Sequence, residues 1–335
     1  RLAAVVTEAA DAAGVSVAVR LVEDAELHTE LVAGAPEAPD LALLDRLAVA
    51  RWQPTGLLHP VDRLVADAVG RNGPVPENVA ALLQVEVRRE KHWYAVPFLS
   101  RGVAWLVRRD LLAERGVSPP TTYADTVSAA PRLADVTQGR RGLALPFFPN
   151  SWGEALAEHL LFAFGGAVTD LTGRRVTLES AEAVEAARFV ASVRDEPWLW
   201  HAPGELGPSG ATAMEQLVRD FHAGRLALVP PVPGLYTRLV GTADRPPEHV
   251  LALPLPAGPK RHTTSAPSYH FVVPTKAARE PVAAFLGQLL RPERLRQVVR
   301  LGAGELVPTY AYLTKDGFWD EDPNYQTLAL GTRGN

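Results

Sequence analysis

The sequence predicts an α/β protein built as two lobes, and three observations lead to this class. Predicted helices and strands alternate along the chain, an order typical of lobes with parallel sheets. The 335 residues, 47% of them hydrophobic, are many for one compact core and suit two. Residues 92–110 contain two β-type apolar runs joined by a bent elbow, as a crossing between two lobes requires.

The elbow lies at residues 99–102, between apolar runs at 94–98 and 103–107. Proline has a fixed φ and no backbone N–H, so we do not expect Pro97 in the middle of an ordinary central strand. Gly102 lets the chain bend a second time. We therefore expect the chain to pass from one lobe to the other at this elbow.

Before the elbow, apolar spacing predicts the order helix, strand, helix, strand, and Gly14 ends the first helix as a C-cap. These elements cover residues 1–13, 15–22, 25–33 and 41–44. After the elbow, Thr122 and Ser180 are predicted N-caps, and Gly116 and Gly224 end helices. The predicted helices there are 109–115, 123–133, 154–164, 181–193, 211–223, 279–290 and 293–301, and the strands are 142–147, 226–229, 250–255 and 269–273.

Composition excludes several classes of protein. The net charge is −4 without a basic stripe, which argues against a nucleic-acid partner. Cysteine is absent, which excludes disulfides, thiolate catalysis and Cys-ligated metals. The nine histidines stand singly, and the chain lacks the Gly-x-Ser-x-Gly, phosphate-loop and HExxH motifs. We therefore expect no metal, no cofactor and no enzymatic activity.

Polar and aromatic residues at predicted strand ends are the candidate ligand contacts, because ligands of open α/β sheets bind there. Asp45 and Arg46 follow the strand at 41–44, where a surface ion pair or a helix cap is the alternative interpretation. Trp152 and Tyr236 lie in loops after strands, and their rings suit the apolar faces of a sugar. Trp105, inside a buried run, is expected in the core. A hydrolase with Asp45 and Glu154 as its carboxylate pair is the rival class.

Eight segments resemble, in the same order, the sugar-binding solute-binding proteins of ABC importers, the family that includes the maltose-binding protein. Each motif alone is weak, but eight in sequence order are specific. They are APDLALLD (38–45), GLLHPV (56–61), WYAVPF (93–98), AWLVRRDLL (104–112), GVSPPTTY (116–123), Gly165-Gly166 with VTLESAEAV (176–184), FHAGRLAL (221–228) and LPLP (253–256).

The resemblance implies a type II periplasmic-binding-protein-like fold, in which two α/β lobes close on a ligand and each lobe is a mostly parallel sheet flanked by helices. Lobe one would comprise residues 1–100 and 255–305, and lobe two residues 104–252 and 306–335. The three crossings would lie near 99–103, 252–255 and 303–308. Because the family begins with a strand before its first helix, we expect lobe one to lack that strand here.

The implied function is that of the substrate-binding component of an ABC importer, which binds a mono- to oligosaccharide in the interlobe cleft and delivers it to the membrane permease. The resemblance also implies a monomer outside the cytoplasm, as a cell-surface lipoprotein or a periplasmic protein, with the signal segment not present in this chain. The implied ligand contacts are Asp45, Arg46, Ser100, Arg101, Asn150, Trp152, Gly234, Tyr236, Ser268 and Tyr269.

Two departures from the family pattern bear on the ligand. The family often carries a stacking tryptophan near the position of Gly234, where the nearest ring here is Tyr236. The usual Gly-Gly before the returning strand is replaced by Ala266-Pro267. Arg101 at the elbow makes an anionic ligand, such as a phosphorylated or acidic sugar or a glycerol derivative, the alternative within the class. The sensor domain of a cytoplasmic regulator is a further alternative.

Overall fold

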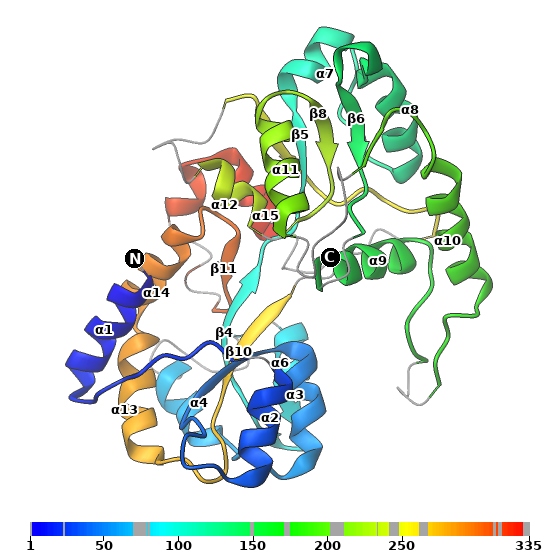
Figure 1. Ribbon diagram of the computed structural model, residues 1–335. Coiled ribbons are helices and arrows are strands. Elements are labelled where there is room, and N and C mark those ends of the chain that lie inside the picture. The colour runs from blue at the N-terminus through cyan, green and yellow to red at the C-terminus, as the bar shows by residue number, and fades with distance from the viewer. Residues whose placement is uncertain are drawn as a thin grey trace. The chain divides into compact units, whose positions relative to one another are not determined.

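The chain divides into two compact units (Figure 1). Unit 1 comprises Arg1–Arg101 and Pro267–Glu321, and unit 2 comprises Gly102–Ala266 and Asp322–Asn335. The chain therefore passes between the units after residues 101, 266 and 321. The computed structural model describes residues 2–22, 24–69, 79, 81–147, 151–170, 175–201, 211–232, 234–240, 248–260, 267–310, 313 and 317–330.

Unit 1 contains a four-stranded sheet in the order β1-β10-β4-β11, and every neighbouring pair is antiparallel. Its strands are β1 (Ala42–Asp45), β10 (Ser268–Val272), β4 (Val96–Arg101) and β11 (Leu306–Pro308). The expectation of a mostly parallel sheet is wrong for this unit. Strands β10 and β11 come from the segment that returns from unit 2, and both run antiparallel to β4.

Strand β4 is an inner strand, and Pro97 lies within it opposite His270. The register of β10 shifts between Tyr269 and His270, so the ladder is irregular at the point where proline cannot donate. This irregularity confirms that Pro97 does not occupy an ordinary position in a central strand.

Helices and a small hairpin complete unit 1 (Figure 1). The helices are α1 (Leu2–Ala13), α2 (Asp24–Ala33), α3 (Arg46–Trp52), α4 (Asp62–Val69), α6 (Ala81–Val87), α13 (Arg279–Leu289) and α14 (Pro292–Leu301), with 3₁₀ turns at Gln53–Thr55 and Gly317–Asp320. The hairpin pairs β2 (Arg88–Arg89) with β3 (His92–Trp93). Helix α1 packs against α13 and α14.

The strand predicted at residues 15–22 does not form. The segment has no regular secondary structure, and the side chains of Val17, Val19 and Leu21 are 39%, 77% and 102% exposed. No described strand pairs with it, and alternation alone does not make a strand without a neighbour and a face to bury. Residues 2–14 form α1 and its cap.

Unit 2 contains a five-stranded mixed sheet in the order β7-β6-β8-β5-β9. The strands are β7 (Leu199–Trp200), β6 (Arg141–Ala144), β8 (Leu226–Val229), β5 (Trp105–Arg108) and β9 (Val250–Leu253). β6 is parallel to β7 and β8, whereas β5 is antiparallel to β8 and β9, so the sheet is only half parallel. Trp105 is 1% exposed and meets Tyr123 edge-on, which confirms its predicted place in the core.

The predicted caps at Thr122, Ser180 and Gly116 are confirmed in unit 2, whereas the helix Ser151–Ala163 begins three residues before its predicted start and the helix Pro323–Leu330 was not predicted. Thr122 forms a capping box with Asp125, Ser180 accepts a hydrogen bond from the backbone N–H of Ala183, and Gly116 ends its helix in the left-handed region. The helices are α7 (Arg109–Arg115), α8 (Tyr123–Leu133), α9 (Ser151–Ala163), α10 (Ala181–Val193), α11 (Ala211–His222), α12 (Leu235–Val240) and α15 (Pro323–Leu330). None of the described helices combines the length and the apolarity that crossing a membrane requires.

A buried polar network holds α15 within unit 2. The Tyr236 hydroxyl donates to Asp322 Oδ2 at 2.5 Å and accepts from Asn324 Nδ2 at 3.0 Å. Asn324 also bonds the backbone of β9, through Ala252 N at 2.8 Å and Val250 O at 3.2 Å. Burial and the Asp322 carboxylate raise the pKa of Tyr236, so its hydroxyl remains protonated and donates at neutral pH.

We predict that Tyr236→Phe lowers the free energy of unfolding by about 1–3 kcal/mol, because it leaves a buried carboxylate without its donor. Urea denaturation measures the loss. Tyr123→Phe is the matched control in the same unit: Tyr123 is buried, and the described residues give its hydroxyl no hydrogen-bond partner. Equal losses in the two variants would contradict the role of the network.

A second prediction concerns acid stability. Arg108, 8% exposed, donates to Asp110 at 2.8 and 2.6 Å, and this pairing lowers the pKa of the Asp110 carboxyl. A depressed folded-state pKa contributes stability above the unfolded-state value, and that contribution is lost as pH falls through the folded-state value. Asp110→Asn should therefore be less stable than wild type at neutral pH, and the difference should shrink below about pH 4. Asp195→Asn, on an exposed ion pair, should show no such convergence in denaturation at each pH.

Candidate functional site

Three of the predicted contact residues lie on one face of the unit 1 sheet, at the end where the chain leaves and re-enters the unit. Asp45 of β1 is directly opposite Tyr269 of β10, which is directly opposite Leu99 of β4. Residues opposite each other share a face, as do residues two apart along a strand, so Arg101 lies on this face as well. We call Asp45, Tyr269 and Arg101 the strand-end row.

Asp45 is the N-cap of α3. Its Oδ1 accepts a hydrogen bond from the backbone N–H of Ala48 at 2.8 Å, and its backbone is extended. The helix-cap interpretation of Asp45 is therefore confirmed. Asp45 is also exposed, so contact with a ligand stays a prediction. Arg46 is the first residue of α3 and is half-buried.

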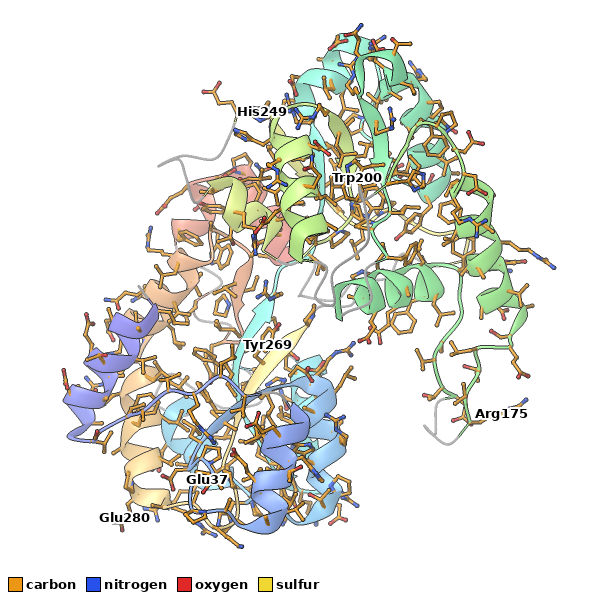
Figure 2. The ribbon with its side chains drawn as sticks, viewed as in Figure 1. Glu37, Arg175, Trp200, His249, Tyr269 and Glu280 are labelled. Carbon is orange, nitrogen blue, oxygen red and sulfur yellow. The ribbon has the colours of Figure 1, made fainter. Side chains whose placement is uncertain are left out.

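Arg101 and Tyr269 form a pair across strands β4 and β10. Tyr269 is labelled in Figure 2. Arg101 Nε donates to the Tyr269 hydroxyl at 3.3 Å, and the guanidinium carbon lies 5.8 Å from the ring centroid. The backbone N–H of Arg101 donates to the carbonyl of Pro267 at 2.7 Å. These contacts hold Arg101, the last residue of unit 1 before the chain passes into unit 2, beside Tyr269, which lies near the start of the returning segment.

The opposite face of the same strands is buried and holds Ser100 and Ser268, which are opposite each other and 3% and 0% exposed. The Ser268 hydroxyl donates to Glu86 Oε2 at 2.5 Å. His270 Nε2 lies 3.0 Å from Ser268 Oγ and 3.3 Å from the same Glu86 oxygen. The Ser268 hydroxyl is therefore occupied inside unit 1, unlike the residues of the strand-end row.

Neither Glu86 nor His270 was predicted from the sequence as part of the site. The alternation in residues 268–272 places His270 on the same face as Ser268, which was the available signal, but nothing local links Glu86 to either residue. The three side chains do not form a nucleophilic triad. Ser268 and Glu86 both lie against Nε2 of His270, whereas a triad places its carboxylate on the other ring nitrogen. Among the described residues, Nδ1 of this buried histidine has no hydrogen-bond partner.

In unit 2 the predicted contacts have different surroundings. Asn150 and the side chain of Trp152 lie outside the described part of the chain, although Trp152 belongs to α9. Gly234 precedes α12 with φ 79°, a value that favours glycine. Tyr236 is fully buried, its hydroxyl bonds Asp322, and its ring meets Tyr325 edge-on at 6.2 Å. Its ring thus packs in the core of unit 2, because the second position of α12 turns inward.

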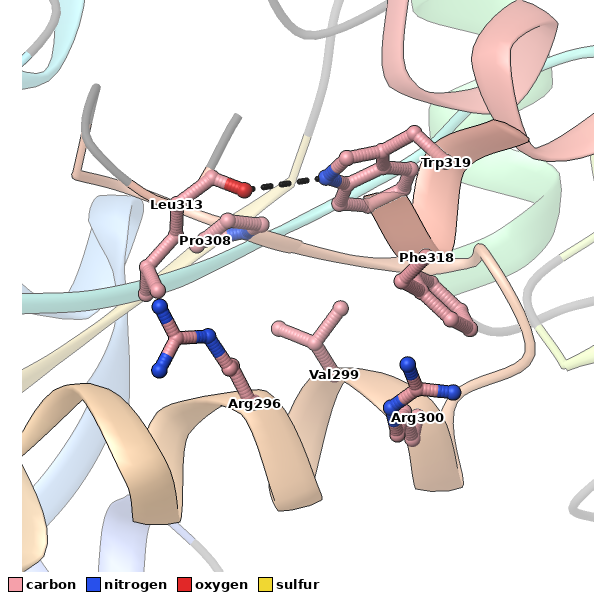
Figure 3. A pocket seen from close by; sticks show the side chains of 7 residues that line it. All are labelled: Arg296, Val299, Arg300, Pro308, Leu313, Phe318 and Trp319. Atoms are coloured by element: carbon pink, nitrogen blue, oxygen red, sulfur yellow. Dashed lines mark hydrogen bonds between the residues drawn. The ribbon is translucent and has the colours of Figure 1, made fainter. Parts of the chain in front are cut away.

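A small pocket in unit 1 is lined by residues of α14, β11 and the turn at Gly317–Asp320 (Figure 3). Arg300 pairs with Glu321 at 2.8 Å and lies over the Phe318 ring, and Trp319 Nε1 donates to the Leu313 carbonyl at 3.0 Å. These polar groups have partners within the protein, so we interpret this pocket as a packing gap. It is lined by Arg296, Val299, Arg300, Pro308, Leu313, Phe318 and Trp319.

The sequence matches the family described as bacterial extracellular solute-binding protein over residues 2–293. The chain belongs to this family. The resemblance found in the sequence motifs is thereby confirmed, and so is the α/β fold class. The maltotriose-binding protein of Pyrococcus abyssi (strain GE5 / Orsay) is 24% identical over 181 residues, which are 54% of this chain and 36% of that protein. The match thus spans little more than a third of that relative's length.

Solved structures of the family share the fold at low sequence identity. The GacH receptor of Streptomyces glaucescens GLA.O, solved unliganded and with acarbose, has a TM-score of 0.79 at 19% identity. The match covers 97% of this chain and 80% of the GacH chain. UgpB of Mycobacterium tuberculosis, in complex with glycerophosphocholine, has a TM-score of 0.74 at 18% identity. The match covers 97% of this chain and 80% of the UgpB chain. At such identities these family members show the fold alone, and the ligand has to be argued from this chain's own residues.

The carboxylate pair of the rival hydrolase is divided between the units. Asp45 belongs to unit 1 and Glu154 to unit 2, and both are exposed. The described residues contain no group of three or more histidine and acidic side chains able to hold a metal ion.

We predict that the two roles of Asp45 can be separated by substitution. Asp45→Ala should lower the free energy of unfolding by about 1 kcal/mol, because it removes the cap of α3, whereas Asp45→Asn retains a capping oxygen and should stay within about 0.5 kcal/mol of wild type. Denaturant unfolding measures both variants. A stable Asp45→Asn protein then reports on the carboxylate charge alone when ligand affinity is measured.

Proposed function

We propose that this protein is the carbohydrate-binding component of an ABC importer, which binds a mono- to oligosaccharide and passes it to a membrane permease. The strand-end row is the observation that carries this proposal. It sets a carboxylate, an aromatic ring and a guanidinium side by side on one sheet face. Aromatic rings stack on the apolar faces of sugars, while charged groups bind hydroxyls, so the row offers the contacts that a sugar needs.

The family and its members support this proposal. The relatives include a maltotriose-binding protein and a receptor that binds acarbose, both of which take carbohydrate ligands. Proteins of an extracellular solute-binding family work outside the cytoplasm, and we infer the same for this chain. We further infer that it acts as a monomer, in partnership with permease subunits.

We also infer that the protein binds without turnover. In unit 1, Ser268, His270 and Glu86 form a buried hydrogen-bond network. Their arrangement is not that of a nucleophile activated by a base. The two carboxylates nominated for glycoside hydrolysis belong to different units. Sugar release from a glycoside panel would contradict this inference and favour the hydrolase.

The test is a thermal-shift screen of mono-, di- and oligosaccharides, followed by calorimetry with the best ligand. We predict that Tyr269→Ala weakens binding at least about tenfold, because the stacking ring is lost. Tyr269→Phe should retain most of the affinity, since only the hydroxyl is removed.

Tyr94→Ala is the matched control. This half-buried tyrosine lies in unit 1 before β4, at the opposite end of the strand from Arg101. Its removal should leave the affinity for the sugar unchanged. An equal loss in Tyr94→Ala and Tyr269→Ala would refute the placement of the ligand at the strand-end row.

A further inference from the structure

We propose that the natural ligand carries an anionic group, a carboxylate or a phosphate, and that Arg101 binds it. This inference rests on the proposed function and narrows its ligand class from carbohydrates in general to acidic or phosphorylated ones. It is carried by the charge balance and the hydrogen-bonding capacity of the strand-end row.

Arg101 has no counter-ion in the described part of the chain. Its side chain is half-buried, and its only described partner is Tyr269, through the hydroxyl and the ring. Two other arginines that are buried or half-buried are paired with carboxylates: Arg108 with Asp110 and Arg140 with Glu114. A half-buried guanidinium without such a pair favours an anion supplied from outside.

Arg101 and Tyr269 both have N–H or O–H donors for which the described residues provide no acceptor. The Tyr269 hydroxyl accepts from Arg101 Nε and so directs its own proton elsewhere, and the described residues provide no acceptor for that proton. The two terminal nitrogens of Arg101 add further donors in a planar fork. Such a fork matches the paired oxygens of a carboxylate or a phosphate better than it matches a single hydroxyl.

The acidic residues of the same sheet do not neutralise Arg101. Glu86 lies on the opposite face, where Ser268 and His270 bind its carboxylate. Asp45 shares the face of Arg101, but β10 separates their strands, a spacing of about 10 Å, and Asp45 caps α3. Asp45 remains suited to sugar hydroxyls, the Tyr269 ring to the apolar face of the sugar, and Arg101 to the anionic substituent.

Compounds that differ only in the charged group test this inference on the full chain. The pairs are galacturonate with galactose, glucose 6-phosphate with glucose, and glycerol 3-phosphate with glycerol. We expect the charged member of at least one pair to bind wild type roughly 10–100-fold more tightly in calorimetry, the range for a charge-assisted hydrogen-bonding pair. The first pair reports a carboxylate ligand, and the other two report a phosphate.

Substitutions then assign the effect to Arg101. In Arg101→Gln the charged and neutral members should bind within about threefold of each other, because the charged member loses the partner of its anionic group. Arg101→Lys keeps the charge without the fork and should show an intermediate preference. Added salt should weaken the charged ligand in wild type and not in Arg101→Gln. Arg89→Gln, which removes an exposed cation from β2, is the matched control and should keep the full preference.

Two results overturn this inference and leave the proposed function intact. One is a wild-type protein that binds neutral sugars at least as tightly as their charged partners, a comparison that needs no variant to fold. The other is an Arg101→Gln protein, folded by its melting curve, that loses charged and neutral ligands by the same factor. If no compound of either kind shifts the melting temperature, the proposed function and this inference both fail.

Discussion

The insertion of β10 between β1 and β4 is the constraint on which the rest of unit 1 depends. Its antiparallel register places Asp45, Tyr269 and Arg101 on one face and Ser100 with Ser268 on the other. A shift of one residue would exchange the two faces, so that the buried serines would be exposed and Tyr269 would enter the core. The register therefore decides which residues can meet a ligand.

The two faces of β10 have opposite chemistry. One is exposed enough for Asp45, Tyr269 and Arg101 to act on a ligand, while the other is closed by Glu86 and His270. The buried hydrogen bonds hold the strand in place, so that the Tyr269 ring and the Arg101 guanidinium keep their positions without a ligand. Ser268 therefore does not line the candidate site. It stabilises β10 from the opposite face of the sheet.

Features that depend on short-range signals could be predicted from the sequence, whereas features that depend on partners distant in sequence could not. Thr122 and Ser180 are caps because the residues three positions later supply the hydrogen bonds. Residues 15–22 have the alternation of a strand but no neighbouring strand, and sequence alone does not reveal that absence. Likewise, Tyr236 resembles a ligand contact until Asp322 and Asn324, far along the chain, occupy its hydroxyl.

The Tyr236 network also joins the two chain segments of unit 2. Asp322 and Asn324 complete a unit that otherwise consists of residues 102–266, and the whole returning segment of unit 1 separates them. During synthesis from the N-terminus, Asp322 and Asn324 are made only after residues 267–321 of unit 1, so this network cannot form until every other segment of both units exists.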